Sequence, residues 1–382
     1  MTIKIKLLLA VFFISTTLFA QQNKQDSLRV INRLDYNNSK KLTIGGYAQI
    51  DYNEPVGSTP GKLDVHRLIM LLGYKFNDKV SFLTEIELEH VKEIFVEQAF
   101  VNYNVNPSFN VKGGLMLVPM GIINEYHEPP VFYGVERPGL DKYIVPTTWR
   151  ELGVGVSGKF DELSLKYQVY IFNGFASYKD GEGTLRGIDG LRKGRQKGAE
   201  SIISSPNLSA KVDYYGILGL KLGLSGYFGN TQTDDSSLDG STVGVTMLGF
   251  DARYILNEFK LKGQYIFTNI SGSEEYNELS GKDLGSQMDG FYGEVAYNFM
   301  PLLNKRSDKE FVLFGRYEKY NTHKKTEGFE ANKAYDRTDI TFGLDYKLVP
   351  GVALKVDFQW LEDELSADNR TNQFNAGIGV MF

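Results

Sequence analysis

The sequence predicts an all-β fold, a 16-stranded antiparallel transmembrane β-barrel with short periplasmic turns and long extracellular loops. Three observations predict it. Segments of ten to fourteen residues alternate apolar and polar side chains from residue 41 to residue 382. Tight turns and long loops alternate between these segments. The side chains predicted to face inward include many charges of both signs, which a small soluble barrel would replace with apolar residues.

The alternation is clearest over residues 80–90. There Phe82 and Ile86 point one way, while Glu85 and Glu87 point the other way. Because successive side chains of a strand lie on opposite faces, this segment has one apolar face and one acidic face. Such a strand can contact lipid on one side and water on the other.

Sixteen such segments are predicted as strands. They cover residues 41–53, 63–76, 80–90, 94–105, 109–118, 151–160, 163–174, 207–215, 218–229, 242–256, 259–271, 288–300, 309–321, 336–348, 352–362 and 372–382. Short connections such as 77–78 and 161–162 alternate with long ones such as 119–150 and 175–206, and 91–93 is an exception among the long ones. This alternation is typical of outer-membrane barrels, whereas strands of a soluble sandwich usually have about 5–6 residues.

The predicted inner face holds 12 basic and 10 acidic side chains. Such charges are costly in a dry core unless they are paired, but a barrel of this size encloses an aqueous lumen. Their near balance predicts weak ion selectivity. The wall and the loop 119–150 are together expected to supply the side chains that line and constrict the pore. These are Arg67, Glu85, Glu87, Lys112, Glu125, Arg137, Arg150, Lys166, Arg253, Lys260, Lys262 and Arg316.

The N-terminus predicts export. Residues 1–20 have the features of a signal peptide, with Lys4 and Lys6 before an apolar stretch too short for a spanning helix. The polar segment 21–40 is open to two interpretations, a short periplasmic helix or disorder. The barrel is expected to fill residues 41–382.

The last strand ends on an outward aromatic side chain, Phe382. This resembles the C-terminal strand of outer-membrane barrels, whose final aromatic residue is recognised by the barrel-insertion machinery. Together with the signal peptide, it predicts a location in the outer membrane of a Gram-negative bacterium.

Composition and motifs exclude several classes of function. The chain without Lys4 and Lys6 has 40 basic and 47 acidic residues, a net charge of −7, which argues against a nucleic-acid partner. There are no cysteines for disulfides or a zinc centre. We expect no cofactor, no metal and no enzymatic activity. The acidic loop at 234–239 is expected to be solvated rather than to bind calcium, and His66 and His90 form at most a modest candidate for a catalytic site at the barrel rim.

Two long loops are the candidate functional segments. The loop 119–150 is too long for a plain connection, and it is either a pore constriction or an external lid. The loop 175–206 is an anion-attracting mouth, a binding site for lipopolysaccharide phosphates, or a solvated mobile segment. Its basic residues are Arg186, Arg192, Lys193, Arg195 and Lys197.

Four stretches carry a resemblance to a known family: EQAFVNY at 97–103, KGGLMLVPMG at 112–121, VERP at 135–138 and RELGVG at 150–155. They resemble the phosphate-selective porin O/P family in its Bacteroidetes-type branch. The resemblance implies a trimeric 16-stranded channel whose inward-folded loops form a constriction. It implies anion preference where arginines and lysines line that constriction.

The sequence therefore favours a porin, a passive diffusion channel for small hydrophilic solutes or ions. Within this class, the alternative to an unselective channel is one biased toward anions such as phosphate. Outer-membrane lipid and lipopolysaccharide would be its other partners. A barrel-embedded enzyme and a structural or adhesin barrel are the alternatives. Ion conductance separates the porin from both.

Overall fold

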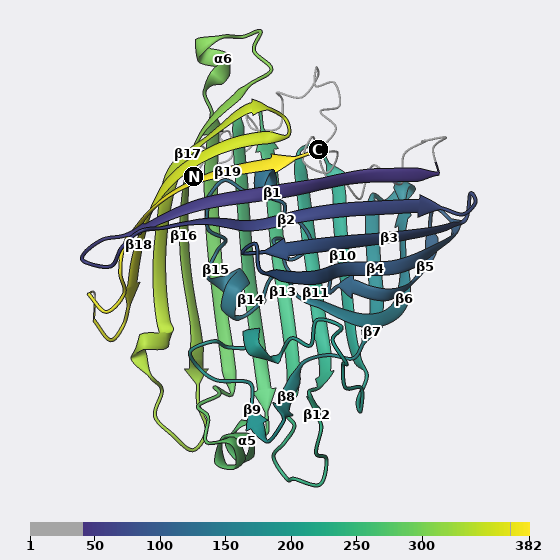
Figure 1. Ribbon diagram of the computed structural model, residues 1–382, viewed down its shortest axis with the longest axis vertical. Coiled ribbons are helices and arrows are strands. Elements are labelled where there is room, and N and C mark those ends of the chain that lie inside the picture. Colours follow the sequence, from purple (N-terminus) through teal and green to yellow (C-terminus); the bar gives the residue numbers. More distant parts are fainter. Residues whose placement is uncertain (1–40, 367) are drawn as a thin grey trace, which may run out of the picture.

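The computed structural model describes residues 41–366 and 368–382. Its 16 long strands close into one antiparallel barrel (Figure 1), which confirms the predicted fold class. The predicted signal peptide at 1–20 and the polar segment at 21–40 lie outside the described residues. Among the described residues, no helix has the length and apolar character to cross a membrane.

The barrel strands agree with the predicted ones, with ends that differ by at most four residues. They are β1 (Leu42–Pro55), β2 (Lys62–Lys75), β3 (Val80–Glu89), β4 (Glu93–Asn106), β5 (Phe109–Leu117), β6 (Arg150–Phe160), β7 (Leu165–Phe172), β10 (Asn207–Ile217), β11 (Leu220–Asn230), β13 (Gly244–Leu256), β14 (Phe259–Ser271), β15 (Gln287–Asn298), β16 (Glu310–Lys325), β17 (Asp336–Val349), β18 (Val352–Asp363) and β19 (Gln373–Met381).

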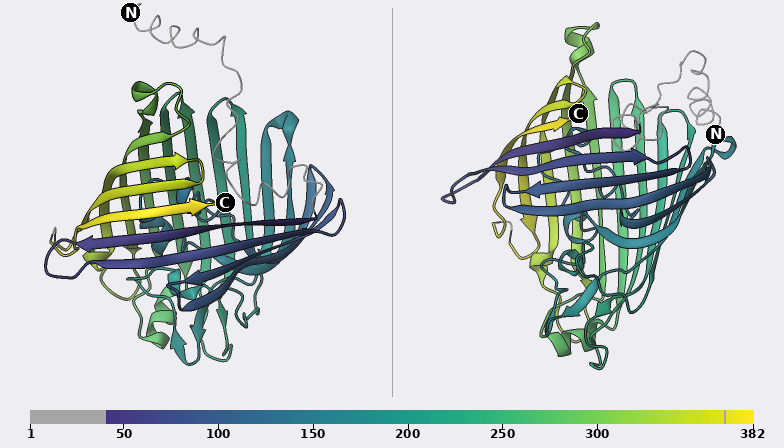
Figure 2. Two further views of the ribbon diagram at one scale, coloured as in Figure 1. Left: turned by 45° about the horizontal axis from the view of Figure 1, so that its top comes forward. Right: turned by 45° about the vertical axis from the view of Figure 1, so that its right-hand side comes forward.

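The first and last strands close the barrel. Tyr47 of β1 pairs with Met381 of β19, and the backbones of Gly46 and Phe382 exchange two hydrogen bonds. In Figure 2 the two strands lie side by side, and β1 to β4 cross β13 to β16 at a steep angle, as tilted strands on different walls do. Closure leaves no unpaired strand edge, which is what a sheet in lipid requires.

The outer face of the wall is apolar. Side chains such as Val154, Leu224, Val295, Phe342 and Trp360 are about half exposed, while their neighbours along the strands point inward. A water-soluble protein rarely exposes so continuous an apolar surface. This face is therefore the one that contacts the membrane.

A small second sheet is separate from the barrel sheet. It is formed by β8 (Ala176–Lys179), β9 (Glu182–Gly183) and β12 (Gln232–Thr233), in the order β12-β8-β9. The helix α5 (Ser273–Ser280) lies at the same end of the molecule, opposite α6 (Met300–Leu303) (Figure 1). The sequence did not predict this sheet, because strands of two to four residues are too short to show alternation.

The remaining short helices lie in the connections. They are η1 (Pro129–Val131), α4 (Leu140–Tyr143), η2 (Asp161–Leu163), η3 (Arg192–Gly194) and η4 (Lys333–Tyr335). Two of them, η1 and α4, belong to the segment 119–150, and each contacts barrel strands. That segment positions the candidate site.

Candidate pore constriction

The segment 119–150 lies inside the barrel. Leu117 at the end of β5 pairs with Arg150 at the start of β6, so the segment leaves and rejoins the wall at one point. Almost every residue between them is buried. The backbone N–H of Ile122 donates to Gln264 Oε1 of β14 at 2.6 Å, on a strand well removed from β5 and β6.

Two wall lysines hold this segment by its backbone. Lys211 of β10 donates from Nζ to the Gly121 carbonyl at 2.6 Å and to Glu125 Oε2 at 2.7 Å. Lys355 of β18 donates to carbonyl oxygens within 129–134, at 2.6 Å and 2.9 Å. These charged donors satisfy carbonyls that would otherwise be buried without partners.

Two wall carboxylates hold the segment from other directions. Glu318 of β16 accepts from the Gly139 N–H at 2.6 Å, and Asp357 of β18 accepts from the Val135 N–H, also at 2.6 Å. Hydrogen bonds from backbone N–H groups to charged acceptors are stronger than those between neutral groups. The segment is thus fastened to strands around the whole wall.

The wall charges are satisfied differently from the sequence-based expectation. We expected them to face an aqueous lumen, but Lys211 is only 1% exposed and Glu318 is 0% exposed. Arg316 contacts Glu318 at 3.2 Å and Glu294 at 3.6 Å, and Lys262 contacts Glu294 at 3.0 Å. Ion pairs and the inserted segment therefore offset the cost of burial, where the sequence suggested water.

A cavity of about 160 Å³ lies between this segment, the loop 175–206 and the wall. Seven basic side chains line it, against four carboxylates. The basic ones are Arg67, Arg137, Lys142, Arg150, Arg192, Arg195 and Lys197. The carboxylates are Glu87, Glu89, Glu136 and Asp141. The cavity thus joins residues that the sequence placed separately in the wall and in the two loops.

The positive charge of this cavity is only partly neutralised. Arg67 pairs with Glu87 at 2.9 Å. Arg192 and Arg195 donate instead to neutral backbone carbonyls, including those of Thr147 at 2.9 Å and Thr148 at 3.2 Å. A carbonyl partner satisfies a guanidinium N–H without cancelling its charge.

The protonation of two loop side chains makes the charge of this cavity depend on pH. Burial raises the pKa of the Asp141 carboxyl to about 7, so this acid is only partly charged at neutral pH. Burial, together with the positive charges of Arg195 and Arg150, lowers the pKa of the Lys197 ammonium to about 8. The cavity is therefore more positive at pH 7 than at pH 9.

A second, smaller cavity lies near the short turns, beyond Tyr133 of the inserted segment. Four basic side chains line it, and Glu294 is its one lining carboxylate. The basic residues are Lys221, Arg253, Lys260 and Lys262. Both cavities thus have an excess of positive charge, which the near-balanced total of the inner face conceals.

Some predicted pore residues lie elsewhere. Lys112 lies over the Phe100 ring at 5.4 Å, and Lys166 pairs in register with Asp213 on the wall. Glu85, Glu125 and Arg316 hold the wall and the inserted segment together, as Glu125 does through Lys211. None of these five lines either cavity.

The predicted basic loop divides into two groups. Arg192, Arg195 and Lys197 line the larger cavity, whereas Arg186 and Lys193 do not. The side chain of Arg186 is 45% exposed and pairs with Asp189, and Lys193 is exposed. One loop therefore offers charges inside and outside the passage.

The two rim histidines lie together. The rings of His66 and His90 stack at 5.4 Å between centroids. Their Nδ1 atoms contact Asp51, at 2.9 Å, and Asp64 respectively. Sequence reasoning noted these two histidines as neighbours at strand ends, but its set of pore residues did not include Lys142 or Glu97. Lys142 shows no periodic signal, because it lies in the irregular segment 119–150.

Comparison with solved structures gives several outer-membrane barrels. The outer membrane channel DcaP of Acinetobacter baumannii is 12% identical, with a TM-score of 0.60 over 89% of this chain and 97% of that one. An anion-selective porin from Comamonas acidovorans is 15% identical, with a TM-score of 0.57 over 89% of this chain and 99% of that one. The trimer form of OmpT, an outer membrane protein of Vibrio cholerae, is 11% identical, with a TM-score of 0.57 over 89% of this chain and 99% of that one. The chain thus has the fold of outer-membrane porins, which agrees with the predicted location.

Sequence comparison gives a relative of much higher identity. No family model matches the chain. An uncharacterized protein of Aquifex aeolicus (strain VF5) is 33% identical over 367 residues, an alignment that covers 91% of this chain and 81% of the relative. The chain belongs to the same family as this Aquifex aeolicus protein.

Proposed function

We propose that the chain is an outer-membrane porin, a passive diffusion channel for small hydrophilic solutes with a bias toward anions. The segment 119–150 narrows the lumen, and a positive cavity lies on each side of it. The proposal rests on the excess of basic over acidic side chains that line the cavities. The ratio is seven to four in the larger cavity and four to one in the smaller one. A charged lining in a confined site raises the local concentration of counter-ions and sets ion preference.

Phosphate is the anion class that the larger cavity suits best. Five of its seven basic side chains are arginines, whose planar guanidinium groups match phosphate oxygens in pairs. The sequence resemblance to phosphate-selective porins supports the same subtype. The fold likeness to the anion-selective porin of Comamonas acidovorans agrees with an anion bias.

The assembly and the membrane partners belong to the same proposal. The trimer form of Vibrio cholerae OmpT supports a homotrimer. The outward ring of Phe382 is 57% exposed, so it is accessible to the barrel-insertion machinery. The exposed Arg186 and Lys193 supply the positive charge that lipopolysaccharide phosphates would bind.

Ion selectivity tests the proposal with a matched pair of variants. We expect Arg192→Gln/Arg195→Gln/Lys197→Gln to lower the anion-to-cation permeability ratio at least about threefold, because three charges leave the passage. The control Arg186→Gln/Lys193→Gln changes the same loop outside the cavity and is expected to keep the ratio. Reversal potentials across planar bilayers in a KCl gradient measure both. Equal effects of the two sets would refute the cavity as the selective region.

The lowered pKa of Lys197 predicts a pH dependence of selectivity. Between pH 7 and pH 9 the side chain loses its proton, since its pKa is about 8, and the anion preference is expected to fall. Lys197→Arg retains its charge over this range and is expected to give a flatter profile. Lys197→Gln is expected to show the low ratio at both pH values. Identical pH profiles for wild type and Lys197→Arg would contradict the assignment.

A further inference from the structure

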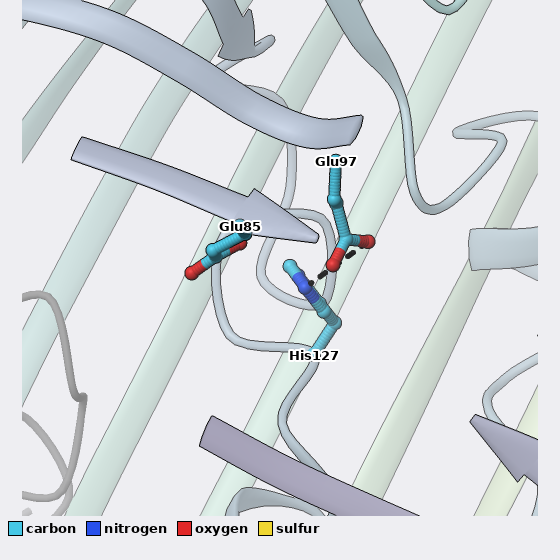
Figure 3. Close-up of side chains that lie close together, drawn as sticks. All are labelled: Glu85, Glu97 and His127. Atoms are coloured by element: carbon cyan, nitrogen blue, oxygen red, sulfur yellow. Dashed lines mark ion pairs between the residues drawn. The ribbon is translucent and has the colours of Figure 1, made fainter. Parts of the chain in front are cut away.

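We propose that Glu85, Glu97 and His127 bind one divalent transition-metal ion of the zinc type, which fastens the segment 119–150 to the barrel wall. Glu85 lies on β3, Glu97 on β4 and His127 in the inserted segment (Figure 3). All three are buried, and one ligand atom from each lies within 4.8 Å of the other two. Sequence reasoning expected no metal, because no local spacing joins these three residues.

The distances suit a tetrahedral ion. Glu97 Oε1 and His127 Nε2 are 3.5 Å apart. Bonds of about 2.1 Å at a tetrahedral zinc place two ligand atoms about 3.4 Å apart. Glu85 completes the set with a modest movement of its flexible side chain. Three protein ligands leave a fourth position for water, as in many zinc sites.

The surrounding hydrogen bonds orient the ligands as metal sites do. His127 Nδ1 lies 3.1 Å from the Asn124 carbonyl oxygen, to which it donates, so Nε2 is the nitrogen that faces Glu97, and Nε2 also lies 2.9 Å from the Tyr47 hydroxyl oxygen. The Tyr47 hydroxyl donates to Glu97 Oε2 at 2.8 Å, and Gln98 Nε2 donates to Glu85 Oε2 at 2.8 Å. Such outer contacts fix the tautomer and the direction of metal ligands.

A buried carboxylate oxygen points independently to a ligand. Glu97 is 0% exposed, and its Oε1 atom has no hydrogen-bond partner among the described residues. Its charged neighbours are His127 at 3.5 Å and Arg67 at 3.9 Å, both beyond ordinary hydrogen-bond length. A buried carboxylate oxygen without a direct hydrogen bond is costly, and a bound cation would satisfy it.

The backbone explains why Glu97 points inward. The register of β3 and β4 shifts at this place, where Glu85 pairs with Gln98 but Ile86 pairs with Val96. Glu97 is the extra residue of this bulge, so both it and Gln98 are buried. Bulges commonly redirect a side chain next to a functional site.

The charges around the three ligands are mixed. Glu85, Glu87 and Glu97 are buried carboxylates, and Arg67 contacts two of them. Arg137 and Arg150 lie in the same cavity lining as Arg67 and Glu87. The alternative is a protonated His127 that pairs with Glu97 without a metal, and binding measurements distinguish the two.

Calorimetric titration of zinc chloride into the chelator-treated, detergent-folded full chain tests the proposal. We expect one equivalent to bind the wild type. His127→Gln and Glu97→Gln are each expected to weaken binding at least about 100-fold, and Tyr47→Phe about 10- to 100-fold. His323→Gln is the matched control, because it removes another buried histidine whose Nε2 atom faces a backbone carbonyl, and it is expected to bind like the wild type.

Heat-modifiable migration on a gel verifies that each variant is folded, so a loss of binding reports on the site. Absence of saturable zinc binding to the folded wild type would overturn the proposal and would favour the His127–Glu97 ion pair. So would binding that survives in His127→Gln but disappears in His66→Gln/His90→Gln, because the rim histidines would then hold the ion. Neither outcome affects the proposed channel, which ion currents test separately.

Discussion

Replacement of residues 120–147 by a short glycine-rich turn is expected to raise the single-channel conductance at least about threefold. This segment lies inside the barrel and bonds to strands around the wall, so on the proposed function its removal widens the passage. The barrel itself should still close. The Val118 N–H donates to the Trp149 carbonyl at 3.0 Å, so a tight turn can join the two strands at that point.

The control for this deletion shortens a loop outside the barrel. Residues 235–239 are mostly exposed, and their removal is expected to leave the conductance unchanged. Heat-modifiable migration shows whether both deletion variants fold. A folded variant without 120–147 that conducts like the wild type would contradict the role of the segment as the constriction.

The substitution Lys211→Met is expected to lower the free energy of unfolding by about 3–5 kcal/mol. The ammonium group of Lys211 is buried and contacts Glu125 at 2.7 Å and Asp251 at 3.6 Å. Methionine retains the volume but removes the ammonium group from both carboxylates, of which Asp251 keeps a second cation, Arg253 at 3.6 Å. Urea titration of the folded barrel in detergent, followed by gel migration, measures the loss.

Two further variants test whether the loss of stability comes from the buried contacts of Lys211 rather than from the removal of any lysine. Lys211→Met/Glu125→Gln is expected to recover part of the stability, because it removes one of the two charges that lose the ammonium group. Lys166→Met on neighbouring β7 changes a lysine that is only partly buried, and its cost is expected to stay within about 1 kcal/mol. Equal losses in the Lys211 and Lys166 variants would contradict the buried contact with the inserted segment.

The wall of the barrel could be predicted from the sequence because its signals are local. Each strand is long enough to show alternation, and side chains such as Glu87 and Phe342 lie on the face that their position in the pattern predicts. Turn residues and strand lengths then fix the number of strands. Membrane barrels depend on this regular pairing, since every backbone group in lipid must be satisfied.

The interior could not be predicted in the same way. Lys355 donates to the carbonyl oxygens of Pro129 and Gly134, which lie more than 220 residues earlier in the chain. No local sequence pattern indicates so distant a contact. The bulge at Glu97 breaks the alternation and places there a carboxylate that the pattern does not assign to the lumen. The near-zero net charge of the inner face also gave a wrong expectation of the charge inside the cavities. Most of the inner carboxylates form ion pairs, while arginines of the larger cavity contact neutral backbone carbonyls.

The reversal potential of the wild-type channel in a planar bilayer with a KCl gradient tests the central claim most directly. The structure places an excess of basic side chains in both cavities. We therefore expect discrete single-channel currents whose reversal potential is shifted from zero toward the equilibrium potential of chloride. Phosphate added to the bath is expected to reduce the chloride current by competing for the arginines. A folded chain that passes no current, or one that prefers potassium, would contradict the proposal.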